Sequence, residues 1–332
     1  MTILERLRRE GIRRLGSPRS GFRYVPRHGR LTKADRARID GLRIPPAWRD
    51  VAIHPSPVAS VQAVGKDRAG RWQYLYHEFQ TVRRERRKRD RLVRFIAALP
   101  RMRRRVTHDL ERRGIPREKV LAGILRILAT CFLRPGSKEY ADENGSYGIT
   151  TLRRQHVKVR GDRTLFDFRG KSGRRHQREL RDPTIARLVR ELLRYRGEVF
   201  KFRSEAGGIV DVQSGHINAY IKETMGEEFS AKDFRTWAGS LLCACALARL
   251  GVAEGGSRTA RKRMVTAAIR EVAEHLGNTP AVCRSSYVFP AVIRSYEEGR
   301  VIQHSFDGWA ELLNGNLRRV ERSETALLEL LR

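Results

Sequence analysis

The stretch His275-Leu-Gly-Asn-Thr-Pro-Ala-Val-Cys-Arg-Ser-Ser-Tyr287 contains the signals for the end of one helix and the start of another. Gly277 lacks a Cβ and suits the left-handed position that follows a helix, so we expect a helix to end there. Thr279 and Pro280 are residues preferred at the N-cap and in the first turn of a new helix. The pattern therefore predicts that Tyr287 lies near the end of a short second helix, where few backbone bonds hold it and it can move.

An upstream stretch, Ser230-Ala-Lys-Asp-Phe-Arg-Thr-Trp-Ala-Gly-Ser240, predicts a longer helix. Ser230 and Asp233 form a capping-box pattern, and the helix is expected to run to about Leu250. Its buried stripe consists of apolar residues at helical spacing: Phe234, Trp237, Ala238, Leu241, Leu242 and Cys245. Arg235 lies in the first turn, off that stripe. A guanidinium there is unfavourable for helix stability but useful for holding a phosphate, which indicates a site.

Together, the segments Lys232-Asp-Phe-Arg-Thr-Trp237 and Gly277-Asn-Thr-Pro280, with Ser286-Tyr287, resemble the type IB DNA topoisomerases, in particular their compact poxvirus-like and bacterial branch. The resemblance covers the chain from about Gly21 to Glu298. It implies an α+β fold with two domains. Residues 1–90 would form a small β-rich domain that clamps DNA, and residues 91–332 a larger, mainly α-helical catalytic domain with a small β-sheet, of the type IB topoisomerase and tyrosine recombinase type.

The composition supports a nucleic-acid partner. The formal net charge is +32, from 69 Lys and Arg residues against 37 Asp and Glu residues. This excess is larger than solubility requires and implies a polyanionic partner, with nucleic acid the leading candidate. A membrane surface is the alternative, but no apolar run approaches the roughly 20 residues that span a bilayer. We therefore expect double-stranded DNA as the partner and no membrane.

The four cysteines lie in apolar or helical stretches rather than in paired metal-ligand spacings: Cys131, Cys243, Cys245 and Cys283. They are interpreted as reduced core thiols of a cytosolic protein. No carboxylate cluster or Cys/His spacing points to a metal site, so we expect neither a metal nor another cofactor. The resemblance implies a cytoplasmic, nucleoid-associated protein of bacterial or viral origin.

The amino-terminal part is expected to form a small antiparallel sheet. Residues 1–20 are basic and lack a core pattern, which favours an accessory helix or a flexible arm, and Thr32 caps a short helix that closes before Gly41. Three segments have strand patterns: Val51–His54, Val58–Gly65 and Arg71–His77.

The last of these strands carries aromatic residues on one face. Trp72, Tyr74 and Tyr76 alternate onto that face, with Gln73 and Leu75 on the other. The aromatic residues could simply fill the core of the domain. Gln73-Tyr-Leu-Tyr76 also looks like the segment with which the family's amino-terminal domain touches duplex DNA. The resemblance therefore implies DNA contacts for Gln73, Tyr74 and Tyr76.

From Val82 to Arg91, seven of ten residues are basic. We interpret this run as an interdomain link that leads into a helix whose apolar side begins at Leu92. A charged run can be only a solvated face, but the overall charge favours phosphate contacts. The basic residues expected to bind DNA are Arg89, Arg91, Lys138 and Lys232.

Helices broken at Pro100 and at Gly114-Ile-Pro116 are expected next, followed by an apolar core helix over Val120–Leu133. Arg134 follows directly after the end of this helix. An arginine there can cap the carbonyl end of the helix. In the family, an arginine at the matching Phe-Leu-Arg position contacts the scissile phosphate, and we favour that role.

Three strands should follow, over Gly148–Leu152, His156–Arg160 and Arg163–Phe168, with Gly161-Asp162 as a hairpin turn. The loop after them contains Gly-Lys-Ser, but a phosphate-binding P-loop needs a glycine where Leu165 stands and a helix afterwards. ATP binding is therefore not supported. Without the family, Lys171 in this loop would be an exposed surface lysine. With the resemblance, it matches the catalytic lysine.

The remaining chain is mainly helical. We expect an amphipathic helix from Asp182-Pro183 towards Gly197, a helix after Ser214, a linker Ala253-Glu-Gly-Gly-Ser-Arg258 and the helix that ends at His275. The tail segments Trp309–Leu313 and Thr325–Leu331 should be helical and dock on the surface.

The resemblance implies a mechanism. Tyr287 would attack a DNA phosphate, forming a 3′-phosphotyrosyl link and releasing a 5′-hydroxyl, while Arg134 and Arg235 hold the non-bridging oxygens. Lys171 would protonate the leaving oxygen. Because the covalent link conserves the energy of the phosphodiester, the strand can rotate and be resealed without ATP or obligatory metal, which relaxes supercoils. The enzyme would act as a monomer that clamps around the duplex.

One position departs from the family pattern. Most members have a histidine in a Gly-His-Thr-Pro motif, where this chain has Asn278. An amide donates a hydrogen bond but brings neither a charge nor an exchangeable proton near neutral pH. We expect Asn278 to donate to a phosphoryl oxygen with activity retained, and His275 to be a helix-end residue.

Two other functions remain possible. Tyrosine recombinases use nearly the same catalytic set, but the Lys-Asp-Phe-Arg-Thr-Trp context and the β-rich amino-terminal domain favour a topoisomerase. A non-catalytic nucleic-acid-binding protein would also fit the charge, and it would shift DNA in a gel without forming a covalent adduct.

Overall fold

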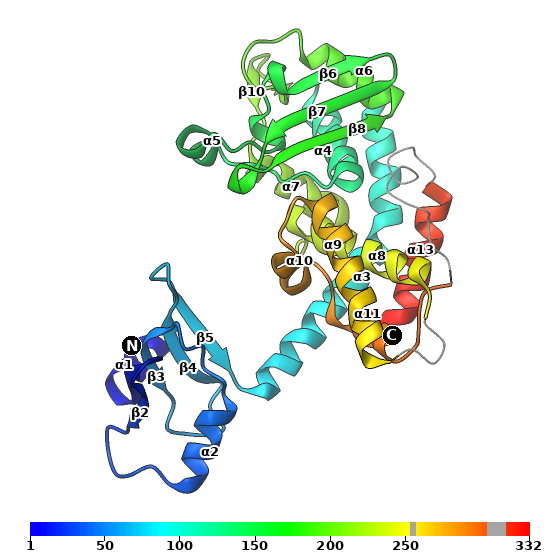
Figure 1. Ribbon diagram of the computed structural model, residues 1–332. Helices are drawn as coiled ribbons and strands as arrows, with labels where there is room; N and C mark the ends of the chain where they lie inside the picture. The colour runs from blue at the N-terminus through cyan, green and yellow to red at the C-terminus, as the bar shows by residue number, and fades with distance from the viewer. Residues whose placement is uncertain (253–256, 304–316) are drawn as a thin grey trace. The chain divides into compact units, whose positions relative to one another are not determined.

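The structure, a computed structural model, describes residues 1–252, 257–303 and 317–332 (Figure 1). The chain divides into two compact units, Met1–Lys88 and Arg89–Arg332. The first unit is built on an antiparallel sheet and the second is mostly helical, which confirms the predicted α+β class. Helix α3 (Glu78–Leu110) contains the boundary between them.

The first unit contains a five-stranded antiparallel sheet with the strand order β2-β1-β3-β4-β5. The strands are β1 (Ile12–Ser17), β2 (Gly21–Val25), β3 (Arg49–Ile53), β4 (Val61–Lys66) and β5 (Trp72–Tyr76), and the helices before the link are α1 (Ile3–Glu10) and α2 (Lys33–Gly41). The three predicted strands are thus present, although Val58 precedes β4 and is 80% exposed. Thr32 caps α2 as expected, with its Oγ1 accepting from the Asp35 backbone N–H.

The expectation of an accessory helix or flexible arm over residues 1–20 was incomplete. Helix α1 is present, but β1 follows it and lies between β2 and β3 in the sheet. Leu7 and Ile12 are buried in the two small cores of this unit. Arg14 lies over the Phe22 ring at 4.1 Å and donates to the carbonyl of Trp48 at 2.7 Å. The basic residues of β1 thus gave no strand pattern in the sequence. The strand is stabilised by its pairing with β2 and β3 and by these local contacts.

The predicted helix break at Pro100 was wrong, and the basic run predicted as the interdomain link is itself helical, with the boundary between the two units inside it. Helix α3 continues from Glu78 to Leu110 through Pro100. A proline inside a helix removes one backbone donor and costs about 3 kcal/mol. Burial of Leu99, Met102 and Val106 on the two sides of Pro100 offsets this cost.

Helix α4 (Arg117–Cys131) is the central helix of the second unit, as predicted. Nearly all of its residues from Val120 to Leu128 are buried. The other α-helices in the described part of this unit are α5 (Lys138–Asn144), α6 (Pro183–Leu192), α7 (Ser214–Met225), α8 (Ala231–Leu250), α9 (Arg258–Leu276), α10 (Pro280–Ser286), α11 (Pro290–Glu297) and α13 (Leu317–Leu331).

A three-stranded antiparallel sheet packs on this helical core. Its strands are β6 (Val157–Arg160), β7 (Arg163–Arg169) and β8 (Arg175–Arg181), and a separate pair is formed by β9 (Lys201–Arg203) and β10 (Ile209–Asp211). Helix α4 contacts β8, whereas α6 contacts β6 and β7 (Figure 1). The predicted Gly161-Asp162 turn is confirmed, because Arg160 pairs with Arg163.

The strand expected over Gly148–Leu152 is instead the short 3₁₀ helix η1 (Ile149–Thr151). Its backbone bonds to the chain after α4, with the Ile149 N–H donating to the Arg134 carbonyl at 2.9 Å. Gly148 fits there because a Cβ would lie 2.5 Å from the backbone nitrogen of Gly136. The apolar pattern therefore reflected burial rather than strand pairing.

The tail forms helix α13, in agreement with the helix predicted over Thr325–Leu331. It contacts α8 and α11, and Val320 and Leu327 are buried there. The segment around Trp309 and most of the predicted linker after Ala253 lie outside the described residues.

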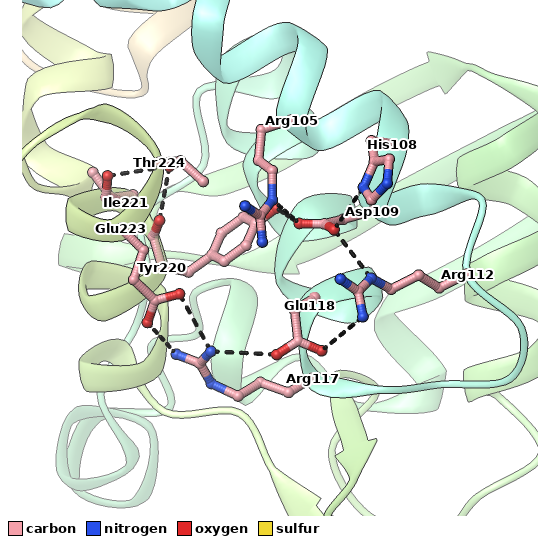
Figure 2. A network of polar contacts seen from close by, with 10 residues as sticks. All are labelled: Arg105, His108, Asp109, Arg112, Arg117, Glu118, Tyr220, Ile221, Glu223 and Thr224. Atoms are coloured by element: carbon pink, nitrogen blue, oxygen red, sulfur yellow. Dashed lines mark hydrogen bonds and ion pairs between the residues drawn. The ribbon is translucent and has the colours of Figure 1, made fainter.

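A buried carboxylate joins α3 to α7. Asp109, whose side chain is fully buried, accepts from Arg105 Nε at 2.7 Å, Tyr220 Oη at 2.8 Å and Arg112 Nε at 3.0 Å, and His108 Nδ1 lies 3.2 Å away (Figure 2). Burial alone raises the pKa of this carboxyl, but the four hydrogen-bonding neighbours outweigh burial and hold the pKa at about 2. The network therefore favours the ionised form in the folded state.

We expect Asp109→Asn to lower the free energy of unfolding at pH 7 by about 3 kcal/mol, because it leaves buried donors poorly matched. The folded-state pKa of about 2 lies below the ordinary value of ~3.9, so the wild-type contribution is present above pH ~4 and is lost as the pH falls towards 2. Urea unfolding of the wild type and the variant at pH 7 and at pH 2 measures how much free energy of unfolding the substitution removes at each pH.

Asp167→Asn is the matched control. The pKa of Asp167 is also about 2, owing to Arg175, but the two side chains are 44% and 67% exposed. Solvent screens an exposed pair, so its loss should change stability little. Equal destabilisation by both substitutions would show that burial of Asp109 is not what matters.

Candidate active site

Arg235 is buried in the first turn of α8, with only 3% of its surface exposed. Its two terminal nitrogens donate to the carbonyls of Phe132 at 2.5 Å and Leu276 at 2.7 Å. Burial, and then the charge of Arg134, lower its pKa to about 10. The prediction that Arg235 lies off the apolar stripe missed this burial, because two other segments cover that side of α8.

Arg134 follows the end of α4 and does not cap that helix. Phe132, in a left-handed conformation with φ of 53°, ends the helix and redirects the chain. Arg134 Nη2 then donates to Oδ1 of Asn278, which comes from the turn between α9 and α10. Two residues 144 positions apart in the chain therefore meet at one place.

The turn around Asn278 forms as predicted. Gly277 has φ of 60° and ψ of 45° and ends α9, and Thr279 Oγ1 accepts from the Val282 N–H at 3.2 Å to start α10. Asn278 itself is buried, with 6% of its surface exposed. The amide is therefore held at a fixed position beside Arg134.

Tyr287 lies at the C-cap of α10 and is half-buried. The Arg235 guanidinium carbon is 4.8 Å from the centroid of its ring. Burial alone raises the pKa of the hydroxyl, but the neighbouring guanidiniums of Arg235 and then Arg134 lower it, and the net direction is downwards. The phenol is thus beside both arginines.

The backbone of Tyr287 is held more firmly than its place at a helix end suggested. Its N–H donates to the Cys283 carbonyl at 3.0 Å, and its carbonyl accepts from Ser240 Oγ at 3.2 Å. A Cβ at Gly239 would lie 2.7 Å from that carbonyl oxygen. The expectation of few backbone bonds was wrong, because Gly239 and Ser240 of α8 contact the backbone of this residue.

Three buried donors at this site have no hydrogen-bond partner among the described residues. They are Arg134 Nη1, Arg235 Nε and Asn278 Nδ2. Nor does Arg235 have a carboxylate partner in the described chain. Unpaired buried donors and an unpaired buried cation are costly, so a cluster of them beside Tyr287 indicates an anion-binding site.

Lys171 is not brought into this group. It lies in the short η3 turn (Lys171–Gly173) at the tip of the β7–β8 hairpin and is exposed. Lys171 makes no hydrogen bond or ion pair with the part of the chain that the structure describes. The hairpin nevertheless reaches the site, because Arg174 Nη1 donates to the Asn278 carbonyl at 2.7 Å.

The candidate DNA-binding residues of the first unit lie on β5. Tyr74 and Tyr76 stack with centroids 6.3 Å apart, and Arg84 lies 3.6 Å above the Tyr76 ring. Tyr74 also packs on a small core, and Gln73 Nε2 donates to Asp67 at 3.0 Å. All three keep part of their surface exposed, and DNA contact stays a prediction for them.

The basic candidates differ in how they are held. Arg91 forms a double hydrogen bond to Asp233, with both distances 2.7 Å, and so ties α3 to the first turn of α8. Arg89 pairs with its neighbour Asp90 at 3.2 Å. Lys138 and Lys232 are exposed in the first turns of α5 and α8. DNA contact by these four residues also stays a prediction.

Two residues at this site were not identified from the sequence. Ser240 contacts the backbone on both sides of Val288, since it donates to the Tyr287 carbonyl and accepts from the Phe289 N–H at 3.0 Å. His176 is buried in β8 beneath Gly277. Neither residue has a sequence signal stronger than its place in a helix or strand pattern.

Two family models match the chain. The model described as eukaryotic DNA topoisomerase I, catalytic core, matches residues 78–305, and the model described as bacterial DNA topoisomerase IB, N-terminal domain, matches residues 21–67. The chain belongs to the type IB DNA topoisomerase family. As a member, it is an isomerase, and the resemblance seen in the motifs is confirmed.

Viral relatives agree with this assignment. DNA topoisomerase 1B of Acanthamoeba polyphaga mimivirus is 32% identical over 298 residues, which cover 86% of this chain and 88% of the relative. DNA topoisomerase I of Monkeypox virus is 21% identical over 271 residues, covering 78% and 81%. This type IB topoisomerase is thus similar to viral enzymes along most of its length.

The described residues also lack two features that other classes of protein would need. No group of three or more His, Cys, Asp or Glu side chains there is placed to hold a metal ion. Every helix in those ranges is too short or too polar to cross a bilayer. The expected cytoplasmic, nucleoid-associated location stays a prediction.

Proposed function

We propose that this topoisomerase relaxes supercoiled duplex DNA through a covalent intermediate on Tyr287. The observation that carries the proposal is the group of unpaired buried donors on Arg134, Arg235 and Asn278, beside the half-buried Tyr287 hydroxyl. A phosphodiester would satisfy these donors and offset the positive charge. This charge distribution supports phosphoryl transfer at the site.

The residues would divide the reaction between them. The Tyr287 hydroxyl releases its proton to solvent as its oxygen attacks the phosphorus, forming a 3′-phosphotyrosyl bond as the bond to the 5′-oxygen breaks. Arg134 and Arg235 donate to the non-bridging oxygens, and Lys171 gives a proton to the departing 5′-oxygen. Religation reverses these steps after strand rotation, and no ATP is consumed because the phosphoester energy is retained.

The first unit would clamp the duplex, with Gln73, Tyr74 and Tyr76 at its surface and the enzyme acting as a monomer. Arg89, Arg91, Lys138 and Lys232 would contact phosphates. The net charge of +32 supports this part of the proposal, since neutralising phosphates releases counterions and favours binding at low salt.

Asn278 would be the third donor to the phosphate. We expect Asn278→Ala to slow single-turnover cleavage by ~10²-fold, the usual loss when one such donor is removed. Asn278→Asp, which has the same shape but replaces the donor with a negative oxygen, should be at least as slow. If Asn278→Ala cleaves as fast as the wild type, the amide has no role in the reaction.

The direct test of the function is relaxation of a supercoiled plasmid in EDTA without ATP. We expect full relaxation of both positive and negative supercoils, because the residues supply the nucleophile, the cations and the acid. An absolute magnesium requirement would contradict the proposal. Strand exchange between paired sites would indicate a recombinase, and binding without cleavage would indicate a DNA-binding protein.

A further inference from the structure

Alternate residues from Arg174, directly before β8, to Arg178 within it hold the turn that carries Asn278. Arg174 donates to the Asn278 carbonyl at 2.7 Å, and Arg178 donates to the carbonyl of His275. His176 lies between them in sequence and contacts Gly277. Because residues two apart in an extended segment point the same way, these three side chains lie on one side of it and together hold the 275–278 turn.

His176 also lies between that turn and the Lys171 loop. A Cβ at Gly170, the residue before Lys171, would lie 2.6 Å from Nε2 of the imidazole. A Cβ at Gly277, the residue before Asn278, would lie 2.9 Å from the same nitrogen. The ring therefore fills the space between the two backbones and leaves no room for a side chain on either.

The rest of the environment fixes the ring. His176 is 5% exposed and stacks on Phe168, with centroids 5.4 Å apart and planes 20° from parallel. Burial, with the nearby arginines led by Arg178, lowers its pKa to about 4. The imidazole is thus neutral near pH 7 and acts by its shape.

We propose that His176 is a positioning residue that sets the distance from the Lys171 loop to the Asn278 turn, and thereby aims Lys171 at the leaving oxygen. This inference rests on the proposed function. The 275–278 turn is held independently, since the Leu276 carbonyl accepts from Arg235 and α9 and α10 flank it. Loss of the ring should therefore displace Lys171 more than Asn278.

The test compares single-turnover cleavage of two duplexes, one ordinary and one with sulfur as the bridging 5′ atom at the cleavage site. A thiolate has a pKa of about 8.5 and leaves without a proton donor, so sulfur bypasses Lys171. We expect His176→Ala to cleave the ordinary duplex ~10²-fold more slowly and to recover most of that loss on sulfur, as Lys171→Ala should.

His156→Ala is the matched control. His156 is another buried histidine near Phe168, with ring centroids 6.5 Å apart, and its ring is tilted against that of Tyr147, with centroids 4.3 Å apart. It should keep the wild-type cleavage rate on both duplexes, and thermal unfolding of each variant checks that it is folded. The inference is overturned if His176→Ala cleaves like His156→Ala, or if its defect is as large on sulfur as on oxygen.

A double substitution tests the spacing itself. Gly170 has an extended backbone, with φ of −99° and ψ of −163°, so alanine is strained there only by the imidazole. We expect Gly170→Ala alone to slow cleavage and to cost nothing further when added to His176→Ala. If the two losses add, the ring is not the spacer and the inference is wrong.

The two levels of the proposal fail differently. If Lys171→Ala has no defect on oxygen, or gains nothing on sulfur, both the role of the lysine and the role of His176 are wrong. If Lys171→Ala behaves as expected and His176→Ala does not, only the positioning role is lost.

Discussion

Replacement of Tyr287 by phenylalanine is expected to abolish plasmid relaxation and covalent adduct formation. Removal of a covalent nucleophile lowers the rate by on the order of 10⁶-fold. The substitution deletes one oxygen from a half-buried ring that lies against Arg235. The backbone bonds to Cys283 and Ser240 remain, so the variant should fold like the wild type.

Tyr296→Phe provides the matched control for this experiment. Tyr296 lies in α11, is 1% exposed, and donates its hydroxyl to the Gly251 carbonyl at 2.9 Å. Its loss should leave relaxation unchanged, although Tyr296 as a whole residue is more buried than Tyr287. Relaxation by Tyr287→Phe at the wild-type rate would remove this residue from the mechanism.

Arg235→Met should slow cleavage by ~10³-fold or more, because an arginine that stabilises a transferring phosphoryl group contributes on that scale. The loss of stability should be small. Arg235 donates to two backbone carbonyls and is a buried cation without a carboxylate among the described residues, so a methionine of similar length removes a desolvation cost together with those bonds. Rates and urea unfolding measure the two effects.

Arg103→Met is expected to lower the stability strongly and to leave the cleavage rate nearly unchanged. Arg103 pairs with Glu324 at 2.7 Å, and the Glu324 side chain is 5% exposed. Removal of the arginine leaves a buried carboxylate unpaired and should cost about 3 kcal/mol of stability while cleavage continues. If Arg235→Met lost as much stability as Arg103→Met and kept its cleavage rate, Arg235 would be a structural residue.

The local signals in the sequence were sufficient for the helix ends. Gly277, Thr279 and the Ser230–Asp233 pair act through contacts within a few residues, and the structure has them as predicted. The α+β class followed from the same kind of pattern, joined to the family motifs. Such features depend on chain stereochemistry and not on what packs against them.

Other features depended on packing between distant segments. Helix α3 passes through Pro100 because its neighbours bury both sides, and β1 lies inside a sheet although its sequence is basic. The burial of Arg235 requires the carbonyls of Phe132 and Leu276. The periodicity of the sequence does not indicate a contact of this kind, since the contact forms only when the elements assemble.

Part of the site was predicted from the sequence. Arg134, Arg235, Asn278 and Tyr287 were named through the family motifs, and they lie together. Lys171 was predicted to be exposed in a loop, and the structure has it exposed at the β7–β8 hairpin tip, but its position relative to the arginines could not be derived, because such a tip has no packing constraint of its own. His176 was missed because only the fold places Gly170 and Gly277 on the two sides of its ring.

The most direct test of the account is to map the covalent bond. The wild-type enzyme is incubated in EDTA with a nicked duplex whose released strand diffuses away, and the protein is then digested and analysed by mass spectrometry. We predict a nucleotide joined through its 3′-phosphate to the peptide that contains Tyr287. An adduct on another residue, attachment through a 5′-phosphate, or the absence of any adduct would contradict the account.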